Sequence, residues 1–419
     1  MIVREELDNG LCLLTEARPG VRSVSFGAWL TRGSRHETGA RSGIAHFVEH
    51  MLFKGTRTRT AEDIAQEIDS IGGQLDAFTA KECASYYVKV LDEHLPRAVD
   101  VLADLLLHPA FDREDIEREK KVVLEEIKMV EDTPDDLVHE LFTQRFWGGH
   151  PLGRPILGVP ETVEALDAGT LAEYFATAYT ARNLIIAVAG NIDHDEVKTL
   201  VEQAFGDVGT EGGAPETSPP VAVPGLLVRD KALEQCHVCL GASGYPQEHE
   251  DRYICYLLNI VLGGSMSSRL FQNIREKRGL AYAVNSGLVS YRDGGAFTIY
   301  AGCDAETVRE VIDLTVAELQ TLRDQPVSDD ELRRAKDHLK GSLVLGLEST
   351  SNRMSHMARQ EMYFGRQFTI DDTLRGVDRV TDEDIQRVAR NLFPPGGLAA
   401  TVLGPVGGVG LTEAQLALS

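Results

Sequence analysis

The sequence predicts an α+β protein built from two similar halves, each with a β-sheet and several α-helices. Three observations indicate this. The chain has 419 residues, enough for two domains of about 200 residues with separate cores. Residues 206–225 are rich in Gly, Pro, Thr and Glu and show no hydrophobic period, which is typical of an interdomain linker. The segments on either side repeat one order of strands and helices, which indicates an internal duplication.

The predicted halves are therefore residues 1–205 and 226–419, with the linker 206–225 between them. In both, an alternating or apolar run predicts a first strand, a helix then ends near glycine, and further strands and a long helix pair lead to a last apolar strand. The matched segments, in chain order, are 24–30 with 236–242, the helix ends at 53–55 with 262–264, the Gly-containing turns 71–75 with 277–280, the strands 83–91 with 296–303, and the last strands 183–190 with 397–404.

Composition limits the classes of partner. The chain is 43% hydrophobic and 26% charged, with a formal net charge of -23, so nucleic acid and anionic membrane surfaces are disfavoured and basic or neutral peptides fit better. No run approaches the roughly 18 apolar residues of a membrane span. The first ten residues lack the features of a secretory signal or a transit peptide. We therefore expect a cytoplasmic protein with no nucleic-acid or membrane partner.

Only one of the cysteine spacings resembles a metal motif. Cys236 and Cys239 form a C-x-x-C in the alternating run 235–240, which predicts a strand. On a strand the two thiols would point to opposite faces. We therefore interpret this pair as structural and not as a zinc or redox site.

The most informative segment contains His46, Glu49 and His50. On a helix, positions 46 and 50 are neighbours one turn apart and Glu49 lies beside them, which suits two metal ligands and a general base. A histidine pair on a helix is often a chance surface feature, but here apolar residues leave no solvated face, and buried ionisable groups need a partner such as a metal. The surrounding apolar residues are Ile44, Phe47, Val48, Met51, Leu52 and Phe53.

The duplication supplies an internal control. At the equivalent positions the second half has Cys255, Leu258 and Asn259, which cannot bind zinc in the same way. If the fold itself required the polar trio, both halves would be expected to keep it. The trio therefore belongs to a function of the first half.

A third ligand is expected on the predicted helix 115–131. Its hydrophobic period places Glu119 and Glu126 on the buried face, whereas Glu125 falls on the solvated side. At the positions equivalent to Glu119 and Glu126 the second half has Ala335 and Ser342, so it lacks these acids as well. We predict Glu126 as the third ligand and Glu119 as a carboxylate that orients a histidine.

These residues resemble the signature of the pitrilysin/insulinase-type zinc peptidases, or inverzincins, in which H-x-x-E-H is followed by a glutamate some 76 residues later. Here Glu126 follows His50 by 76 residues. The resemblance covers the whole chain and is strongest to the subfamily of mitochondrial processing peptidase and its bacterial relatives. It implies that each half is a mixed, largely antiparallel sheet packed against helices. It also implies that His46, His50 and Glu126 hold one Zn²⁺ and that Glu49 activates water.

The same resemblance implies a substrate site assembled from further segments. Family members carry an Arg and a Tyr seven residues apart that reach the substrate carbonyl, and Arg275 and Tyr282 have that spacing. In two-half subunits these groups act on the partner's zinc site, which implies a dimer, expected here to be a homodimer with a heterodimer as the alternative. The family also binds peptide as an added strand, and the matching segment is Asp76, Ala77, Phe78 and Thr79, where many relatives have Asn in place of Asp76.

The sequence thus predicts a zinc-dependent endopeptidase that hydrolyses peptides or unfolded segments in a closed chamber, with Glu49 as general base and Arg275 and Tyr282 stabilising the oxyanion. The rival hypothesis is a metal-binding but catalytically silent scaffold or partner subunit of a heteromeric processing peptidase.

Overall fold

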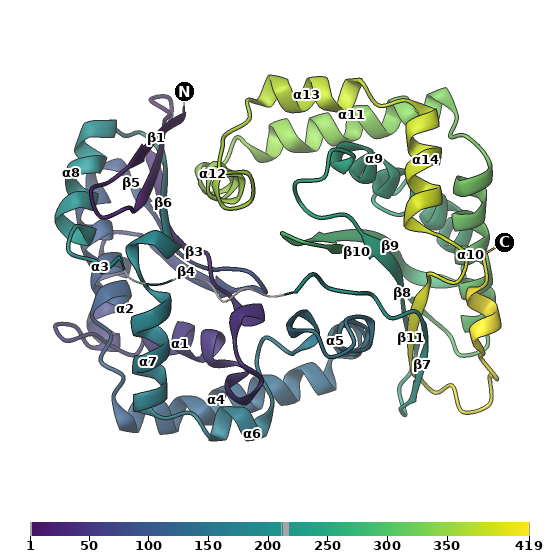
Figure 1. Cartoon of the computed structure of the whole chain (residues 1–419), viewed down its shortest axis with the longest axis horizontal. Helices are drawn as coiled ribbons and strands as arrows, with labels where there is room; N and C mark the ends of the chain where they lie inside the picture. The colour runs from purple at the N-terminus through teal and green to yellow at the C-terminus, as the bar shows by residue number, and fades with distance from the viewer. Residues whose placement is uncertain (1, 211, 213–217, 419) are drawn as a thin grey trace. The chain divides into compact units, whose positions relative to one another are not determined.

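The computed structural model describes residues 2–210, 212 and 218–418. Residues 211 and 213–217 of the predicted linker lie outside the described residues. Two compact units are present, and both are discontinuous in sequence (Figure 1). Unit 1 comprises Met1–Met129, Arg154–Thr217 and Gly346–Gln367, and unit 2 comprises Val130–Gly153, Ser218–Leu345 and Phe368–Ser419.

Unit 1 is organised around a six-stranded mixed sheet. Only the β2–β6 pair is parallel among the described pairings of this sheet, and its other neighbours are antiparallel. The strand order places β1 at one edge and β4 at the other. From edge to edge the strands are β1 (Ile2–Glu6), β2 (Cys12–Ala17), β6 (Leu184–Gly190), β3 (Ser23–Leu30), β5 (Ala84–Leu91) and β4 (Gln74–Thr79).

Both faces of this sheet are covered because the side chains of its central strands are apolar on both sides. Phe26 and Ala28 of β3 pack into the larger core with the helices of the first half, whereas Trp29 packs with methionines of α12 (Thr350–Phe364) on the other face. Figure 1 shows α12 beside β6 and β3. The other helices of this unit are α1 (Ile44–Leu52), α2 (Ala61–Ser70), α3 (Leu95–Leu107), α4 (Arg113–Asp132), α6 (Pro160–Glu164), α7 (Ala168–Ala178) and α8 (His194–Phe205).

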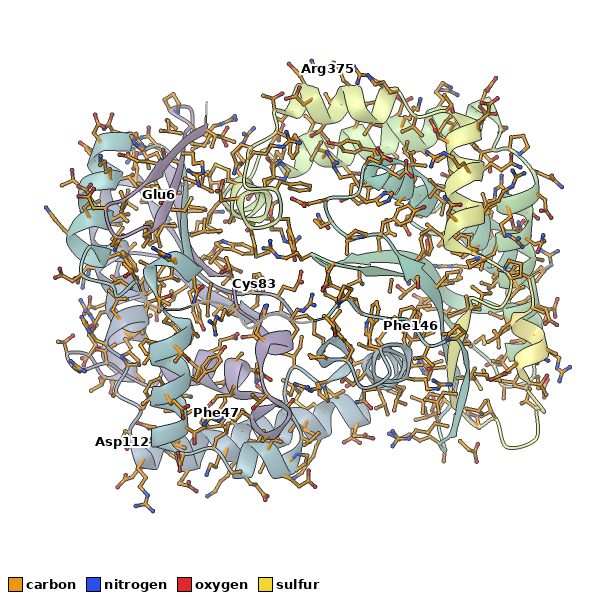
Figure 2. All side chains as sticks on the ribbon, viewed as in Figure 1. Glu6, Phe47, Cys83, Asp112, Phe146 and Arg375 are labelled. Carbon is orange, nitrogen blue, oxygen red and sulfur yellow. The ribbon has the colours of Figure 1, made fainter. Side chains whose placement is uncertain are left out.

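Unit 2 contains a five-stranded sheet in which β7 and β11 are parallel and the other described pairs are antiparallel. The order is β7 (Gly225–Asp230), β11 (Ala399–Gly404), β8 (Cys236–Gly244), β10 (Gly295–Cys303) and β9 (Ala281–Ser290). One face carries α9 (Arg252–Leu262), α10 (Val308–Asp324), α11 (Asp329–Gly346), α13 (Ile370–Asp378) and α14 (Asp382–Leu392). The other face is covered by α5 (Pro134–Phe146), whose Phe142 and Phe146 are buried there; Figure 2 marks Phe146.

The sheet of unit 2 has the topology of five of the six strands in unit 1. Strands β2, β6, β3, β5 and β4 correspond in order and direction to β7, β11, β8, β10 and β9. This confirms the predicted α+β fold with two similar halves, each a mixed, largely antiparallel sheet with helices. The compact units do not follow contiguous ranges throughout, since α5 precedes the linker in sequence but packs in unit 2, and α12 follows the linker but packs in unit 1.

Two further predictions from the sequence can be compared with the structure. Cys236 of β8 is buried with the α9 and α10 side of its sheet, and Cys239 is buried with α5 on the opposite side, so the two thiols do point to opposite faces as expected. Among the described residues, no helix is long and apolar enough to cross a membrane.

Candidate metal centre

The metal motif lies on α1, a short helix held in place from its first residue. Its N-cap is Gly43, with φ at +94°, and a Cβ at this position would lie 2.6 Å from the carbonyl oxygen of Leu157. The Glu37 carboxylate accepts the N–H groups of Gly43 and Ala45 at 2.8 Å each, so two N–H groups with no acceptor inside the helix are satisfied. Apolar side chains bury the rest of the helix. One of them, Phe47, is labelled in Figure 2.

Three side-chain atoms from α1 and α4 converge at one point. His46 Nε2 and His50 Nε2 are 3.2 Å apart, and Glu126 Oε2 lies 3.6 Å from the first and 3.5 Å from the second. Two ligand atoms that each lie about 2.1 Å from a tetrahedral zinc ion are separated by about 3.4 Å. The three separations therefore fit three corners of a zinc tetrahedron and leave the fourth corner for another ligand.

The orientation of His50 is fixed by a carboxylate behind it. Its Nδ1 lies 3.0 Å from Oε1 of the buried Glu119, and Lys54 Nζ lies 2.7 Å from Oε2 of the same side chain. Because an ionised carboxylate only accepts hydrogen bonds, Nδ1–H is the donor, and the lone pair of His50 is then on Nε2. This is the tautomer that a metal requires at that atom.

Burial sets the protonation of His46 and leaves an oxygen of Glu126 without a partner. Burial, and to a smaller extent the repulsion that a protonated His50 would exert, lowers the pKa of His46 to about 3, so its imidazole is neutral at neutral pH. Glu126 Oε2 is buried and accepts no hydrogen bond from any described residue. A buried carboxylate oxygen beside two neutral imidazole nitrogens is compensated by a cation, and oxygen and imidazole nitrogen are both zinc ligands.

Glu49 lies on the same helix and faces the edge strand β4. Burial raises the pKa of Glu49, and the hydrogen bond that Thr79 Oγ1 donates to its Oε2 opposes this rise. Thr79 is the last residue of β4. The carboxylate is thus held by one oxygen, and among the described residues its Oε1 has no hydrogen-bond donor.

The predicted substrate segment, Asp76 to Thr79, lies in β4, which has a strand neighbour on one side only within the described sheet. Its outer edge can therefore accept another strand. The Asp76 carboxylate is engaged locally: it accepts the N–H of Ala77 at 3.0 Å and the hydroxyl of Tyr87 at 3.3 Å.

Arg275 and Tyr282 lie together in unit 2, whereas His46, His50 and Glu126 belong to unit 1. The Arg275 guanidinium lies 4.8 Å from the ring centroid of Phe271 and 5.0 Å from that of Tyr282. Tyr282 is 78% exposed. The two side chains therefore form one accessible pair near the start of β9.

The positions of the second half that correspond to His46, Glu49 and His50 hold no metal-binding set. Cys255 and Leu258 are buried among apolar residues of α9, and the Asn259 side chain accepts the Ser286 hydroxyl at 2.7 Å. Within the described part of the chain, His46, His50 and Glu126 form the only group of three side chains whose ligating atoms lie close enough together for one metal ion.

Sequence reasoning missed three contacts that shape this centre. It assigned Thr79 to the substrate strand but not to Glu49, and it did not connect Lys54 to Glu119 or Glu37 to the start of α1. The Glu37 contact had only a general signal, because negative charge is favourable near a helix N-terminus and Glu37 stands six residues before the N-cap Gly43. The other two join residues 30 and 65 positions apart in sequence, where no local period applies.

A two-half α+β fold whose first half carries three converging side chains able to hold a metal ion fits the class of zinc peptidases that the sequence predicted. Residues 12–159 match the sequence profile described as insulinase (peptidase family M16). Residues 165–339 match the profile described as peptidase M16 inactive domain. The chain belongs to the M16 family of peptidases. The range matched by the second profile includes Cys255, Leu258 and Asn259, which stand where the first half has His46, Glu49 and His50.

Relatives that are 42% and 45% identical align with 93% and 94% of the chain. It is 45% identical over 393 residues to the uncharacterized zinc protease YmxG of Bacillus subtilis, with 94% of this chain and 96% of that protein aligned. It is 42% identical over 398 residues to an uncharacterized zinc protease of Streptomyces coelicolor, covering 93% and 87% of the two chains. A crystal structure described as the peptidase M16 inactive domain from Pseudomonas fluorescens superposes with a TM-score of 0.91 at 21% identity, covering 96% of this chain and 98% of that one. The relatives' names are those of zinc proteases, and the structural match establishes the same fold.

Proposed function

We propose that this chain is a zinc-dependent endopeptidase that hydrolyses peptides or unfolded segments, with His46, His50 and Glu126 holding one zinc ion. The observation that carries the proposal is the set of separations among their three donor atoms, 3.2, 3.5 and 3.6 Å. The buried, unpartnered Oε2 of Glu126 supports it independently. Glu119 acts behind His50 by fixing its tautomer.

A zinc ion bound at this site supplies Lewis acidity, which makes water more acidic and polarises a peptide carbonyl. The residue that moves the proton is Glu49. Its carboxylate, with a pKa raised by burial, takes a proton from the attacking water and later gives it to the leaving amine. The Thr79 hydroxyl holds Oε2, so Oε1 is the oxygen directed to this task.

The substrate backbone is proposed to add to the outer edge of β4 along Asp76, Ala77, Phe78 and Thr79. Main-chain hydrogen bonds on a sheet edge give affinity with little sequence preference. Because Thr79 ends this strand and contacts Glu49, a peptide in register with β4 would run toward the general base. The net charge of -23 favours peptides that are basic or neutral.

Arg275 and Tyr282 are proposed to stabilise the tetrahedral oxyanion of a substrate bound to the partner subunit of a homodimer. Their exposure and mutual stacking support this role. Mixing the inactive Glu49→Gln chain with an inactive Arg275→Ala chain should restore activity, because one mixed site then contains both intact groups. If the mixture stays inactive while subunit exchange is demonstrated, the partner-supplied role is wrong.

The direct test of the proposed reaction uses a fluorescence-quenched unstructured peptide and two variants of the zinc-loaded protein. Glu49→Gln should retain one zinc ion per chain and lose turnover. Glu125→Gln, which changes an exposed glutamate on α4 that pairs with Lys128 at 2.7 Å, should retain both. Undiminished hydrolysis by the Glu49 variant would refute the assigned base.

The rival role as a silent scaffold predicts a different outcome of the same assay. The wild-type chain would then bind zinc but cleave nothing alone, and cleavage would appear only after a second, different chain is added. The intact Glu49 and the complete ligand set favour the active subunit.

A further inference from the structure

A second candidate site lies in unit 1, away from the metal centre. A cavity of about 560 Å³ opens where β1, β2 and β6 meet the end of α12. Its floor follows the strand register, since Glu6 pairs with Cys12 and Cys12 pairs with Ile185. Cys12 and Ile185 belong to the apolar cluster that packs against α12, and Leu7 and Leu184 belong to the larger core, so the cavity lies at the β1 edge of the sheet beside α12. Figure 2 marks Glu6 on β1 at this edge.

The cavity and the metal centre lie at opposite edges of the sheet. The cavity is at β1, whereas helix α1 contacts β4, which is the other edge strand. Five strand spacings of about 4.8 Å place the two edges about 24 Å apart. The cavity is therefore not part of the proposed peptide-hydrolysing site.

One wall of the cavity contains a buried carboxylate, one oxygen of which has no hydrogen-bond partner among the described residues. Glu361 of α12 is 9% exposed. Its Oε1 accepts Arg4 Nε at 2.9 Å, whereas its Oε2 is buried and accepts no hydrogen bond from the described residues. A buried carboxylate oxygen is stabilised by a hydrogen-bond donor, and most strongly by a cationic donor.

Another wall carries an exposed cation. Arg182 extends over the turn between β1 and β2, where a Cβ added at Gly10 would lie 3.6 Å from its Cγ. Within the described part of the chain, no carboxylate forms an ion pair with this guanidinium. Arg182 is therefore available for an anionic ligand group, and the geometry of its guanidinium suits a carboxylate.

The remaining lining limits the ligand further. Leu7, Ile185 and Met362 give the cavity an apolar portion, and Glu6 and Asp8 add two carboxylates that also favour a ligand with an ammonium group. A ligand with only an anionic group would donate no hydrogen bond to Oε2 of Glu361. A ligand with only a cationic group would leave Arg182 unpaired. A cavity of this volume is within the range of small-molecule sites. The best match is a small molecule with one ammonium group, one carboxylate and an apolar side chain.

We propose that this cavity binds a zwitterionic α-amino acid or dipeptide with an apolar side chain. Its ammonium group donates to Oε2 of Glu361, its carboxylate pairs with Arg182, and its side chain packs against Met362 and Ile185. The site stands on unit 1 alone and does not depend on the proposed peptidase activity.

The test is isothermal titration of the full-length, zinc-loaded protein with three probes. L-leucine carries both charges, leucinamide lacks the carboxylate, and N-acetyl-leucine lacks the ammonium group. Saturable binding is expected for leucine, with at least tenfold weaker binding of each blocked probe. No saturable binding of leucine at millimolar concentration, or equal binding of all three, would overturn the proposal.

Two variants distinguish this cavity from leucine chelating the zinc ion. Arg182→Gln changes an exposed side chain and should weaken leucine binding at least tenfold. Arg97→Gln, which changes another exposed arginine of unit 1 with only a 3.5 Å ion pair, should leave leucine binding unchanged. Glu361→Gln provides a second readout, with leucine binding weakened and N-acetyl-leucine binding not weakened. Binding of leucine that survives in the Arg182 variant would place it elsewhere and refute the assignment.

Discussion

Replacing Glu119 by glutamine should weaken zinc binding without removing a zinc ligand. Its carboxylate is 3% exposed and holds Nδ1–H of His50 at 3.0 Å while Lys54 Nζ lies 2.7 Å from its other oxygen. Glutamine has nearly the same shape but loses the charge and presents an N–H₂ group to one of these donors. His50 is then less strongly held in the tautomer that leaves Nε2 free, and the charge of Lys54 is no longer balanced beside the site.

The size of the effect follows from similar carboxylate–histidine contacts in metal sites. Loss of such a contact reduces metal affinity roughly 10- to 100-fold, which corresponds to about 1.4 to 2.8 kcal/mol. Because two donors share this one carboxylate, we expect a loss in the upper part of that range. Competition with a chromogenic zinc chelator of known affinity measures it, and circular dichroism verifies that the variant is folded.

The matched control is Glu125→Gln on the same helix. Glu125 is exposed and pairs only with Lys128, three residues away, so its loss should alter zinc affinity by less than about twofold, in line with the small energies of exposed ion pairs. If Glu119→Gln binds zinc as tightly as wild type, or if both variants lose affinity equally, Glu119 does not act through His50.

Three further outcomes follow from the same contacts. Thr79→Val removes the hydrogen bond that lowers the pKa of Glu49, so this pKa should rise and the acidic limb of the kcat/KM profile should move to higher pH; an unmoved limb contradicts the assignment. Gly43→Ala places a Cβ 2.6 Å from Leu157 O at a φ of +94° and should destabilise the fold by about 1–3 kcal/mol or more in urea unfolding. Glu37→Gln replaces one of the two accepting carboxylate oxygens by an NH₂ group, so one backbone N–H at the start of α1 loses its acceptor. The free energy of unfolding in urea should fall by about 1–3 kcal/mol, and wild-type stability would exclude the capping role.

Much of the metal centre could be predicted because its residues obey local periods. The spacing of His46 and His50 fixes them on one face of a helix, and the 3.6-residue period of α4 places Glu126 on the buried side. The structure brings the three together. The strand pattern was equally informative, since buried strands such as β6 are apolar throughout and each has a counterpart in the other half.

The packing of α5 and α12 was beyond the reach of these arguments. A helix with apolar residues on one face must cover something, but its period does not say which sheet. Phe142 and Phe146 of α5 fit the sheet of unit 2, and Met354 and Met357 of α12 fit that of unit 1. Such choices depend on shape complementarity between segments far apart in sequence, and the reliance of Glu49 on Thr79 is a polar example of the same limit.

The most direct test of the account is a crystal structure of the zinc-loaded chain with anomalous data collected on both sides of the zinc absorption edge. We predict one zinc peak per chain, within about 2.0–2.2 Å of His46 Nε2, His50 Nε2 and an oxygen of Glu126, and none at Cys255, Leu258 and Asn259. A peak held by other residues, or coordination that omits Glu126, would contradict the central claim that α1 and α4 together build the metal site.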